Sequence, residues 1–239
     1  IGGNKILLED RDTRVFLDFG MSFGQRGAYF DEFMSPRLAT GIKDFIEMGL
    51  IPDRQRTYRT DLLRMMDRTD TETDIDAVLL THAHADHADY ISFLHEDIPI
   101  YMGETCKLIL EAIEHRSARK FEREILSFKP RPSDRKEDPV DRTVNTFRTC
   151  DKFKVGSLEV EPIHVDHSVP GAYGFIIYTS SGPAPPRRPM ARSLNGGKVR
   201  QGLALCQSAR RNARTKTRTV TCPAALQCPR PLSRQGYPD

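Results

Sequence analysis

The segment DAVLLTHAHADH, at residues 76–87, constrains this chain more than any other part of its sequence. A short apolar run ends there, and four potential metal ligands follow it within six positions: His82, His84, Asp86 and His87. The apolar run predicts a buried strand, and open α/β sheets commonly present ligand-binding groups just beyond the carboxyl ends of their strands. Zinc binds imidazole nitrogen and carboxylate oxygen, and the alanine spacers let these side chains turn inward together. The pattern therefore predicts a metal site rather than a solvated loop with incidental histidines.

Short apolar runs alternate with helical stretches through residues 1–182, which predicts an α/β fold. The expected strands are 5–9 and 13–20, joined as a hairpin by a turn at residues 10–12, followed by 76–82 and 98–103. The expected helices are 60–67 with Thr60 as N-cap, 89–96, and 104–116 with Leu108, Ile109 and Ile113 as its buried stripe. His95 and His115 fall on these helices and are expected to be solvated. Residues 145–180 are strand-rich with a turn at Gly156, and the charged, proline-rich stretch 129–141 is expected to be a surface loop.

The charge divides the chain into two parts. From Pro183 to Asp239 there are twelve Lys or Arg residues and one acid, so this tail carries +11 while residues 1–182 carry −8. The tail contains no Phe, Ile, His or Glu, so it has too little apolar surface to offset the entropy lost on ordering. We therefore predict a folded part, 1–182, and a basic tail, 183–239, that is disordered or arises from a reading-frame error. A tail that binds nucleic-acid phosphates is the functional alternative.

The first fifteen residues lack a basic segment followed by an apolar stretch, which a secretory leader would show. No later segment approaches the roughly 20 apolar residues of a membrane helix. The expectation is a cytoplasmic protein with no membrane partner.

Three segments resemble a known family. The HxHxDH pattern resembles the metal-binding motif of the metallo-β-lactamase superfamily. The segment EPIHVDHSVPGAYGFII resembles the third motif of its RNase J-like, β-CASP nuclease branch, in which a histidine ends a strand and Ser, an aliphatic residue and Pro follow. The opening segments IGGNKILLE and VFLDFGMSFG resemble the paired first strands of that branch. The resemblance covers nearly all of residues 1–182 and implies an αββα sandwich, of which this chain supplies about one half.

The resemblance also implies the metal ligands. The first metal position would be built by three histidines, His82, His84 and His167. The second would use Asp86 and His87, and Asp86 would also orient the attacking hydroxide. Such a site binds two zinc ions in the family, with manganese as an alternative, and hydrolyses phosphodiester bonds in nucleic acid, RNA in preference to DNA.

Three further residues receive roles outside the ligand set. Asp18, at the end of the second strand, would brace the metal loop, because hydrogen bonds from outside a metal site orient its ligands. Ser168 would donate a hydrogen bond to a phosphate of the substrate. His164, three residues before His167, is expected to be structural or to line the rim of the site.

Two ligands of the family have no counterpart in this sequence. The family completes its site with an aspartate in a TGD-like segment and with a later histidine. Here the one acid after residue 182 is Asp239, and His167 is the last histidine. The β-CASP nucleic-acid-binding domain is likewise missing from this sequence. We therefore expect one well-bound zinc ion and little or no nuclease activity.

Two alternatives stay open. One is a catalytically silent protein that binds a metal and nucleic acid. The other is a small-molecule hydrolase of the same fold acting on thioesters or lactams, against which the HSVPGAYGFII segment favours a nuclease. The sequence leaves the oligomeric state open.

Overall fold

The structure is a computed structural model, and it describes residues 2–30, 34–116, 121–131, 138–180 and 192–193. Most of the basic tail lies outside these ranges, so its predicted disorder and the boundary after Gly182 stay predictions. Two of its residues are described: they form β11 (Arg192–Ser193), which pairs antiparallel with β1.

The larger sheet has six strands in the order β11-β1-β2-β3-β4-β7. Its bounds are β1 Lys5–Asp10, β2 Thr13–Phe19, β3 Ala77–Leu79, β4 Ile100–Gly103 and β7 Val144–Phe147. β1 and β2 form an antiparallel hairpin, whereas β2, β3, β4 and β7 run parallel. A parallel sheet requires a crossover between successive strands, and the helical segments between β2, β3 and β4 provide it.

A smaller antiparallel sheet lies against the larger one. It has the order β10-β9-β8, with β8 Phe153–Val155, β9 Leu158–His164 and β10 Tyr173–Tyr178. Side chains that alternate along the strands of both sheets meet in one buried cluster, which includes Val15, Leu17, Leu79, Val160 and Phe175. A two-stranded ribbon, β5 (Ser127–Phe128) and β6 (Val140–Asp141), completes the strands.

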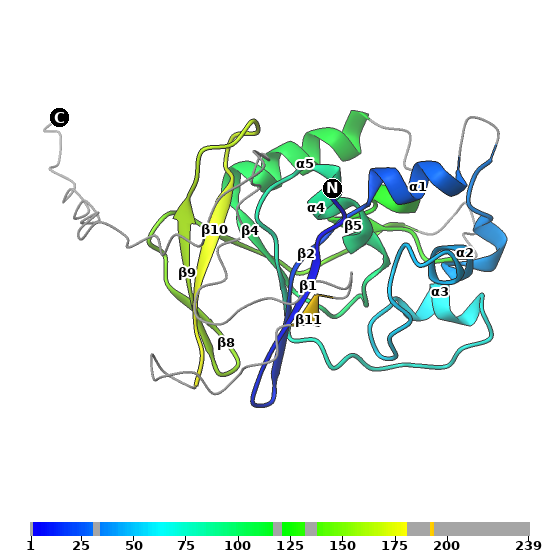
Figure 1. Ribbon diagram of the computed structural model, residues 1–239, viewed down its shortest axis with the longest axis horizontal. Helices are drawn as coiled ribbons and strands as arrows, with labels where there is room; N and C mark the ends of the chain where they lie inside the picture. Colours follow the sequence, from blue (N-terminus) through cyan, green and yellow to red (C-terminus); the bar gives the residue numbers. More distant parts are fainter. Residues whose placement is uncertain (1, 31–33, 117–120, 132–137, 181–191, 194–239) are drawn as a thin grey trace, which may run out of the picture. The chain divides into compact units, whose positions relative to one another are not determined.

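The helices lie on the other face of the larger sheet (Figure 1). Their bounds are α1 Phe23–Tyr29, α2 Lys43–Glu47, α3 Thr60–Arg64, α4 Ala85–Ala88 and α5 Glu104–Arg116, with short 3-10 turns η1 Leu38–Thr40, η2 Asp89–Phe93 and η3 Phe121–Arg123. A second core of mainly aromatic and aliphatic side chains fills the space between helices and sheet. Among the described residues no helix covers the outer face of β8, β9 and β10, so the chain shows one helical layer and both sheets of an αββα sandwich (Figure 1).

Most of the predicted elements are confirmed in type, but the stretch 129–141, expected to be a surface loop, ends in β6. Thr60 is not the N-cap of α3: Arg59 occupies that position, and the Thr60 hydroxyl donates to Glu96. The buried stripe predicted for α5 is wrong for Leu108, which is 63 % exposed; the helix buries Cys106 and Leu110, and Ile109 is partly buried against the core. The predicted helix at 89–96 is a 3-10 turn that ends at Phe93.

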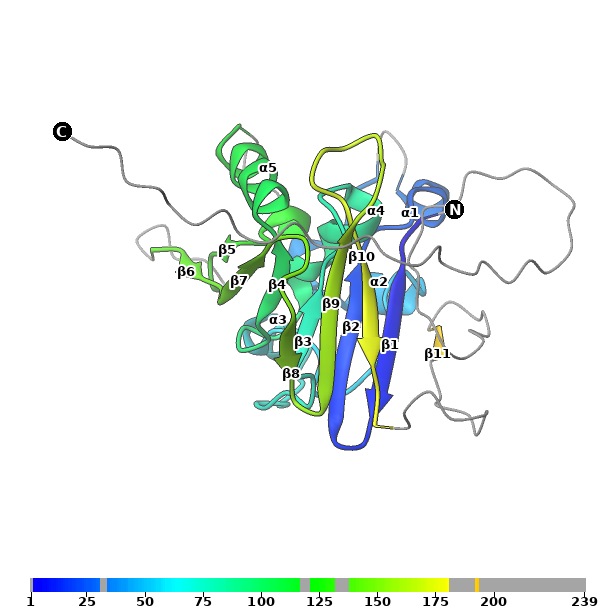
Figure 2. The same ribbon diagram turned by 90° about the vertical axis from the view of Figure 1, so that its left-hand side faces the viewer.

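The edge of the sandwich at the carboxyl ends of β2 and β3 positions the site. α1, α4 and the loop between β9 and β10 all lie at this edge (Figure 2). The backbone joins the two sheets there, because Tyr173 N donates to Thr81 O at 2.9 Å. Loops that follow β3 and β9 are thereby brought together.

Candidate metal centre

Three histidines converge at this edge. One ligand nitrogen from each of His82, His84 and His167 lies within 4.8 Å of the others. The Nε2 atoms of His82 and His167 are 2.9 Å apart, and the ring centroids of His84 lie 4.8 and 4.9 Å from those two rings. Two nitrogens bound tetrahedrally to one zinc at 2.0–2.1 Å are about 3.4 Å apart. The donor set and its spacing therefore fit one zinc ion with small side-chain adjustments.

Each histidine is placed by a strand end. β3 ends at Leu79, and the chain then passes the buried Thr81 and His82 before α4 begins. His84 is the residue before α4 and has extended backbone dihedrals. His167 comes from the loop after β9, 85 residues further along the chain from His82. Only the packing of the two sheets brings it to the other histidines.

A buried hydrogen-bond network supports the loop from below. Asp18 is fully buried, and its Oδ1 accepts from Thr81 N at 2.8 Å. The Thr81 hydroxyl lies 3.0 Å from Asp18 and 2.8 Å from His82 Nδ1. Asp18 Oδ2 is 2.7 Å from Nδ1 of His87. Because Nδ1 of His82 and Nδ1 of His87 both make hydrogen bonds in this network, the Nε2 atom of each ring is available to bind a ligand. Hydrogen bonds from outside a metal site fix the orientation of metal-binding imidazoles in this way.

Asp18 reaches this position because β2 is bulged. Lys5 pairs with Phe19 and Ile6 with Leu17, so Asp18 is the extra residue between them. Its φ is +57°, a left-handed conformation that aspartate tolerates better than most residues. A bulge redirects a side chain that would otherwise follow the strand's alternation, and here it turns a carboxylate toward the metal loop.

The pKa values of the imidazoles follow from burial and charge. Burial, and then the charges of the neighbouring imidazoles, lower the pKa of His82 to about 2, so its ring is neutral, as a ligand must be. Burial and the neighbouring imidazoles also lower the pKa of His167. Burial opposes a charge on His87, but the hydrogen bond and the negative charge of Asp18 outweigh it and raise the pKa of His87.

Asp86 and His87 form a second pair of donors beside the three histidines. Asp86 Oδ2 lies 3.6 Å from His87 Nε2, and the His87 ring is 4.0 Å from the His82 ring between centroids. The backbone oxygen of Asp86 accepts from Gly3 N at 3.0 Å and Asn4 N at 3.2 Å. The start of β1 therefore holds Asp86 in place.

Gly20 makes this approach possible, and replacing it is expected to disrupt the site. A Cβ on Gly20 would lie 1.9 Å from the backbone oxygen of Asp86, which cannot move without moving the metal loop. We expect Gly20→Ala to destabilise the protein by about 1–3 kcal/mol and to weaken zinc binding, as measured by urea unfolding and zinc titration. Gly24→Ala is the matched control, because nothing lies within 4 Å of a Cβ there and alanine favours the helix. Equal zinc affinity in both variants would contradict this account of Gly20.

The remaining predicted positions differ in their surroundings. Ser168 is exposed and directly follows His167, so its proposed contact with substrate stays a prediction. His164 is exposed, with its ring 5.6 Å from that of Tyr173. His115 is exposed as expected, but the prediction for His95 is wrong: it is 2 % exposed and lies in the core.

Sequence reasoning missed Thr81 and the glycines that contact Asp86. Thr81 touches three residues of the site, and its place immediately before His82 was the available signal. Gly2, Gly3 and Gly20 all pack closely on Asp86 or its neighbours. Three glycines flanking the first hairpin were the signal for a close backbone approach.

Comparison of the sequence with models of known protein families shows which family the chain belongs to. The profile of the Beta-lactamase superfamily domain matches residues 51–184, more than half of the chain. The chain belongs to this superfamily. The match includes all four ligand candidates of the HxHxDH loop and His167, and the described helical layer and two sheets correspond to three of the four layers of the metallo-β-lactamase αββα sandwich.

Individual relatives are more distant. The chain is 29% identical over 111 residues to "Ribonuclease J" of Sinorhizobium meliloti, a match that covers 46% of this chain and 16% of that protein. A crystal structure of a protein of unknown function from Enterococcus faecalis is 25% identical with a TM-score of 0.55, covering 76% of this chain and 39% of that one. The metallo-beta-lactamase fold protein YhfI from Bacillus subtilis is 17% identical with a TM-score of 0.37, covering 73% and 50%. The chain thus spans less than two fifths of the length of the first two relatives.

None of the helices in the described part of the chain combines the length and the apolar composition that a membrane span requires.

Proposed function

We propose that this chain is a zinc-dependent metallohydrolase of the RNase J-like type, acting on phosphodiester bonds in nucleic acid, with RNA preferred. The convergence of His82, His84 and His167 within 4.8 Å carries the proposal. Three imidazoles from two separate loops provide three protein ligands and leave a fourth position open, as catalytic zinc sites do. The similarity to a ribonuclease J, although it covers 46% of this chain, supports RNA as the substrate.

Different residues of the chain would hold the metal, orient its ligands and contact the substrate. The three histidines would hold the zinc ion. Asp18 would fix the orientation of His82 through Thr81, and that of His87 directly. Zinc supplies a Lewis acid that activates water and stabilises the charge that develops on phosphate. Asp86 lies half-buried at the edge of the histidine cluster, where its carboxylate would orient the attacking water and accept its proton. Ser168 on the exposed side would donate a hydrogen bond to a phosphate oxygen.

A second metal would bind weakly. Its donors among these residues are Asp86 and His87, and two donors hold zinc less firmly than three. The histidine and aspartate that complete the family's two-metal site have no counterpart after His167 in this sequence. With these donors alone, the chain would act as an impaired nuclease, whose activity depends on a high concentration of free metal. Manganese is an alternative occupant, because imidazole and carboxylate accept both ions.

Two alternative functions make different predictions. A catalytically silent protein would bind one zinc and RNA without turnover. A small-molecule hydrolase would cleave a thioester or lactam faster than a phosphodiester, at the same histidines.

The test combines metal analysis with two substrates. After removal of excess metal, the purified chain is expected to retain one zinc per molecule. It is expected to cleave a chromogenic phosphodiester and a labelled RNA slowly, with a rate that rises as zinc or manganese is added. His115→Ala, which changes an exposed histidine far from the cluster in the sequence, is the control for nonspecific metal effects.

Two outcomes would overturn the proposal. Faster hydrolysis of a chromogenic cephalosporin or a thioester than of the phosphodiester would assign the chain to small-molecule substrates. One bound zinc with RNA binding but no turnover at saturating metal would assign it to the silent class.

A further inference from the structure

Helix α1 is unusual because it buries none of its side chains. Its sequence, FGQRGAY, contains two glycines, Gly24 and Gly27, and nothing lies within 4 Å of a Cβ at either position. Glycine in a helix costs about 1 kcal/mol relative to alanine. Phe23 is 54 % exposed and Tyr29 45 % exposed. A helix that presents aromatic rings to solvent and leaves open space beside its backbone has the features of a contact surface.

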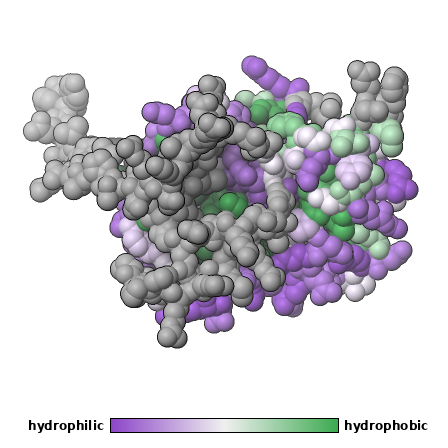
Figure 3. All heavy atoms as spheres, in the orientation of Figure 1, coloured by the Kyte–Doolittle hydropathy of each residue, from purple (hydrophilic) through white to green (hydrophobic). Residues whose placement is uncertain are grey.

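A cavity of about 290 Å³ opens beside this helix. It is lined by Met21, Phe23, Arg26, Gly27, Asp89, Glu122 and Arg123. Small-molecule sites begin at roughly 300 Å³, so the cavity lies at the lower limit of that range, a size that suits one small planar ring system. Apolar surface, in green, is visible on the side of the molecule where α1 lies (Figure 3).

Ion pairs hold the polar side chains that line the cavity in place. Arg26 makes two hydrogen bonds of 3.0 Å to Glu122, one to each carboxylate oxygen. Arg123 donates to Asp89 at 3.3 Å, and Asp89 is 6 % exposed. These groups supply both donors and acceptors around an apolar floor.

The cavity adjoins the metal loop. Met21, on its floor, donates its backbone N–H to Ala85 O at 3.0 Å, next to Asp86. Asp89 lies two residues after His87, where α4 gives way to η2. A strand of nucleic acid whose phosphate reached the three histidines would therefore have a neighbouring nucleotide within reach of the cavity.

We propose that this cavity binds one base of a single-stranded RNA, next to the phosphate held at the metal centre. The proposal rests on the proposed function and names a subsite for its substrate. The exposed Phe23 ring would stack on the base, and Arg26 and Arg123 would donate hydrogen bonds to its edge or to the adjoining phosphate. Stacking on an aromatic side chain is the usual source of affinity for single strands, and it tolerates any base.

The chemistry favours a base over a peptide. A peptide in this position would need an exposed strand edge or an apolar groove to bind its backbone or side chains. The cavity instead combines one exposed aromatic ring with fixed arginine and carboxylate groups. This combination suits a flat heterocycle with donors and acceptors on its rim.

Binding of RNA without turnover tests the proposal. Anisotropy of a fluorescein-labelled oligoadenylate with cleavage-resistant phosphorothioate linkages would be measured with the zinc-loaded chain, so that the metal centre is intact and no strand is cleaved. We expect Phe23→Ala to bind roughly tenfold more weakly than the parent chain. Tyr178→Ala is the matched control, because Tyr178 is 45 % exposed on β10 of the other sheet, and we expect it to leave affinity unchanged. Circular dichroism of both variants checks folding, which exposed positions should not disturb.

A second oligonucleotide, which lacks the base at one position, tests whether the cavity binds the base itself. It should bind the parent chain more weakly than the intact strand does, while Phe23→Ala should bind both strands alike. Equal affinities of the parent and Phe23→Ala, an equal loss with Tyr178→Ala, or no RNA binding at all would overturn the subsite. Self-association that disappears in Phe23→Ala, with RNA affinity unchanged, would assign the surface to a second copy of the chain. If Phe23-dependent binding is found but no phosphodiester is cleaved, the proposed activity fails and the subsite stands.

Discussion

His167→Ala is expected to weaken zinc binding by more than about 100-fold. Replacing a residue that merely supports a metal ligand typically costs 10–100-fold in affinity, and the proposed role of His167 is that of a ligand itself. His82 and His84 would remain, but they lie on one short loop and leave the metal with one face unprotected. A competition titration against a chromogenic zinc chelator measures the loss.

His164→Ala is the control for this substitution. His164 lies at the end of β9, three residues before His167, and is exposed, with its ring packed on Tyr173. It should retain the zinc affinity of the parent chain. If both variants bound zinc equally well, His167 would not be a ligand, and the metal would have to be held by the HxHxDH loop alone.

The fold could be predicted where local patterns decide it. The hairpin of β1 and β2 follows from two apolar runs around a turn, and β3 follows from a run that ends at the histidines. The face that α5 buries could not be predicted in the same way. Its sequence allows two stripes, and contacts with β4 and β7 select the one that contains Cys106 and Leu110. Residues distant in sequence make that choice.

The candidate site shows the same division. His82, His84, Asp86 and His87 are close in sequence, so their proximity follows from a short loop. His167 required a resemblance, because its approach to His82 depends on the packing of two sheets. The place of Thr81 immediately before His82 was a signal for that residue, but its hydrogen bonds to Asp18 could not be read from the sequence, since they depend on a bulge that turns Asp18 out of the alternation of β2. Nor could His95 be placed, because the helix predicted around it ends at Phe93 and the chain then enters the core.

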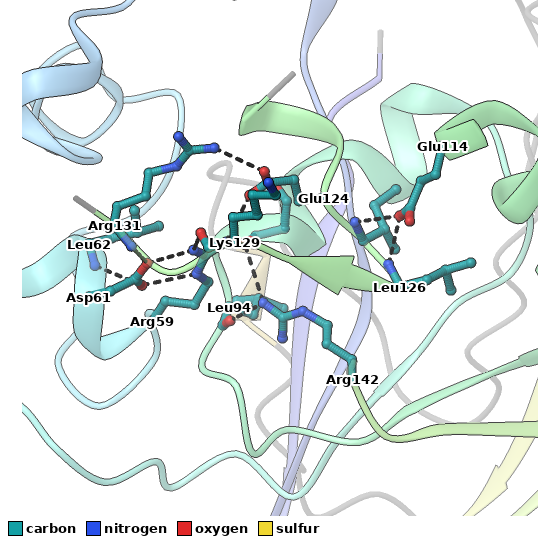
Figure 4. A network of polar contacts seen from close by, with 12 residues as sticks. Arg59, Asp61, Leu62, Leu94, Glu114, Glu124, Leu126, Lys129, Arg131 and Arg142 are labelled. Atoms are coloured by element: carbon teal, nitrogen blue, oxygen red, sulfur yellow. Dashed lines mark hydrogen bonds and ion pairs between the residues drawn. The ribbon is translucent and has the colours of Figure 1, made fainter. Parts of the chain in front are cut away.

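A buried ionic network connects the segment after α5 to the core (Figure 4). Arg59 has no exposed side-chain surface, and it donates to Asp61 at 2.6 and 3.0 Å and to Glu124 at 3.4 Å. Its guanidinium also donates to the backbone oxygens of Ser92 and Lys129. Through these bonds one side chain links α3, η2 and the segment that leads into β5.

A second arginine extends this network. Arg142 donates to the backbone oxygens of Ser92, Leu94 and His95 at 2.6–3.2 Å. Both guanidinium groups lie over the ring of Phe128, at 3.9 Å for Arg59 and 5.1 Å for Arg142. Burial, and then the positive charge of Arg59, lower the pKa of Arg142 to about 9. The two cations therefore repel each other, and the negative charges of Glu96, Asp61 and Glu114 offset part of that repulsion.

Arg59→Ala is therefore expected to lower the free energy of unfolding by about 3–5 kcal/mol, because removing one partner of a buried ion pair leaves the other charge uncompensated. Asp61 keeps its bonds from Leu62 N and Arg131 N, and Glu124 keeps Arg131, which places the loss at the lower end of this range. Urea unfolding followed by circular dichroism measures this loss of stability.

Arg148→Ala is the matched control. Arg148 also pairs with a carboxylate, Glu104 at 2.8 Å, but its side chain is 73 % exposed, and solvent-exposed pairs contribute little. A similar change in the two variants would mean that the buried network does not hold the segment to the core, and that the packing of Phe121 and Phe128 does so instead.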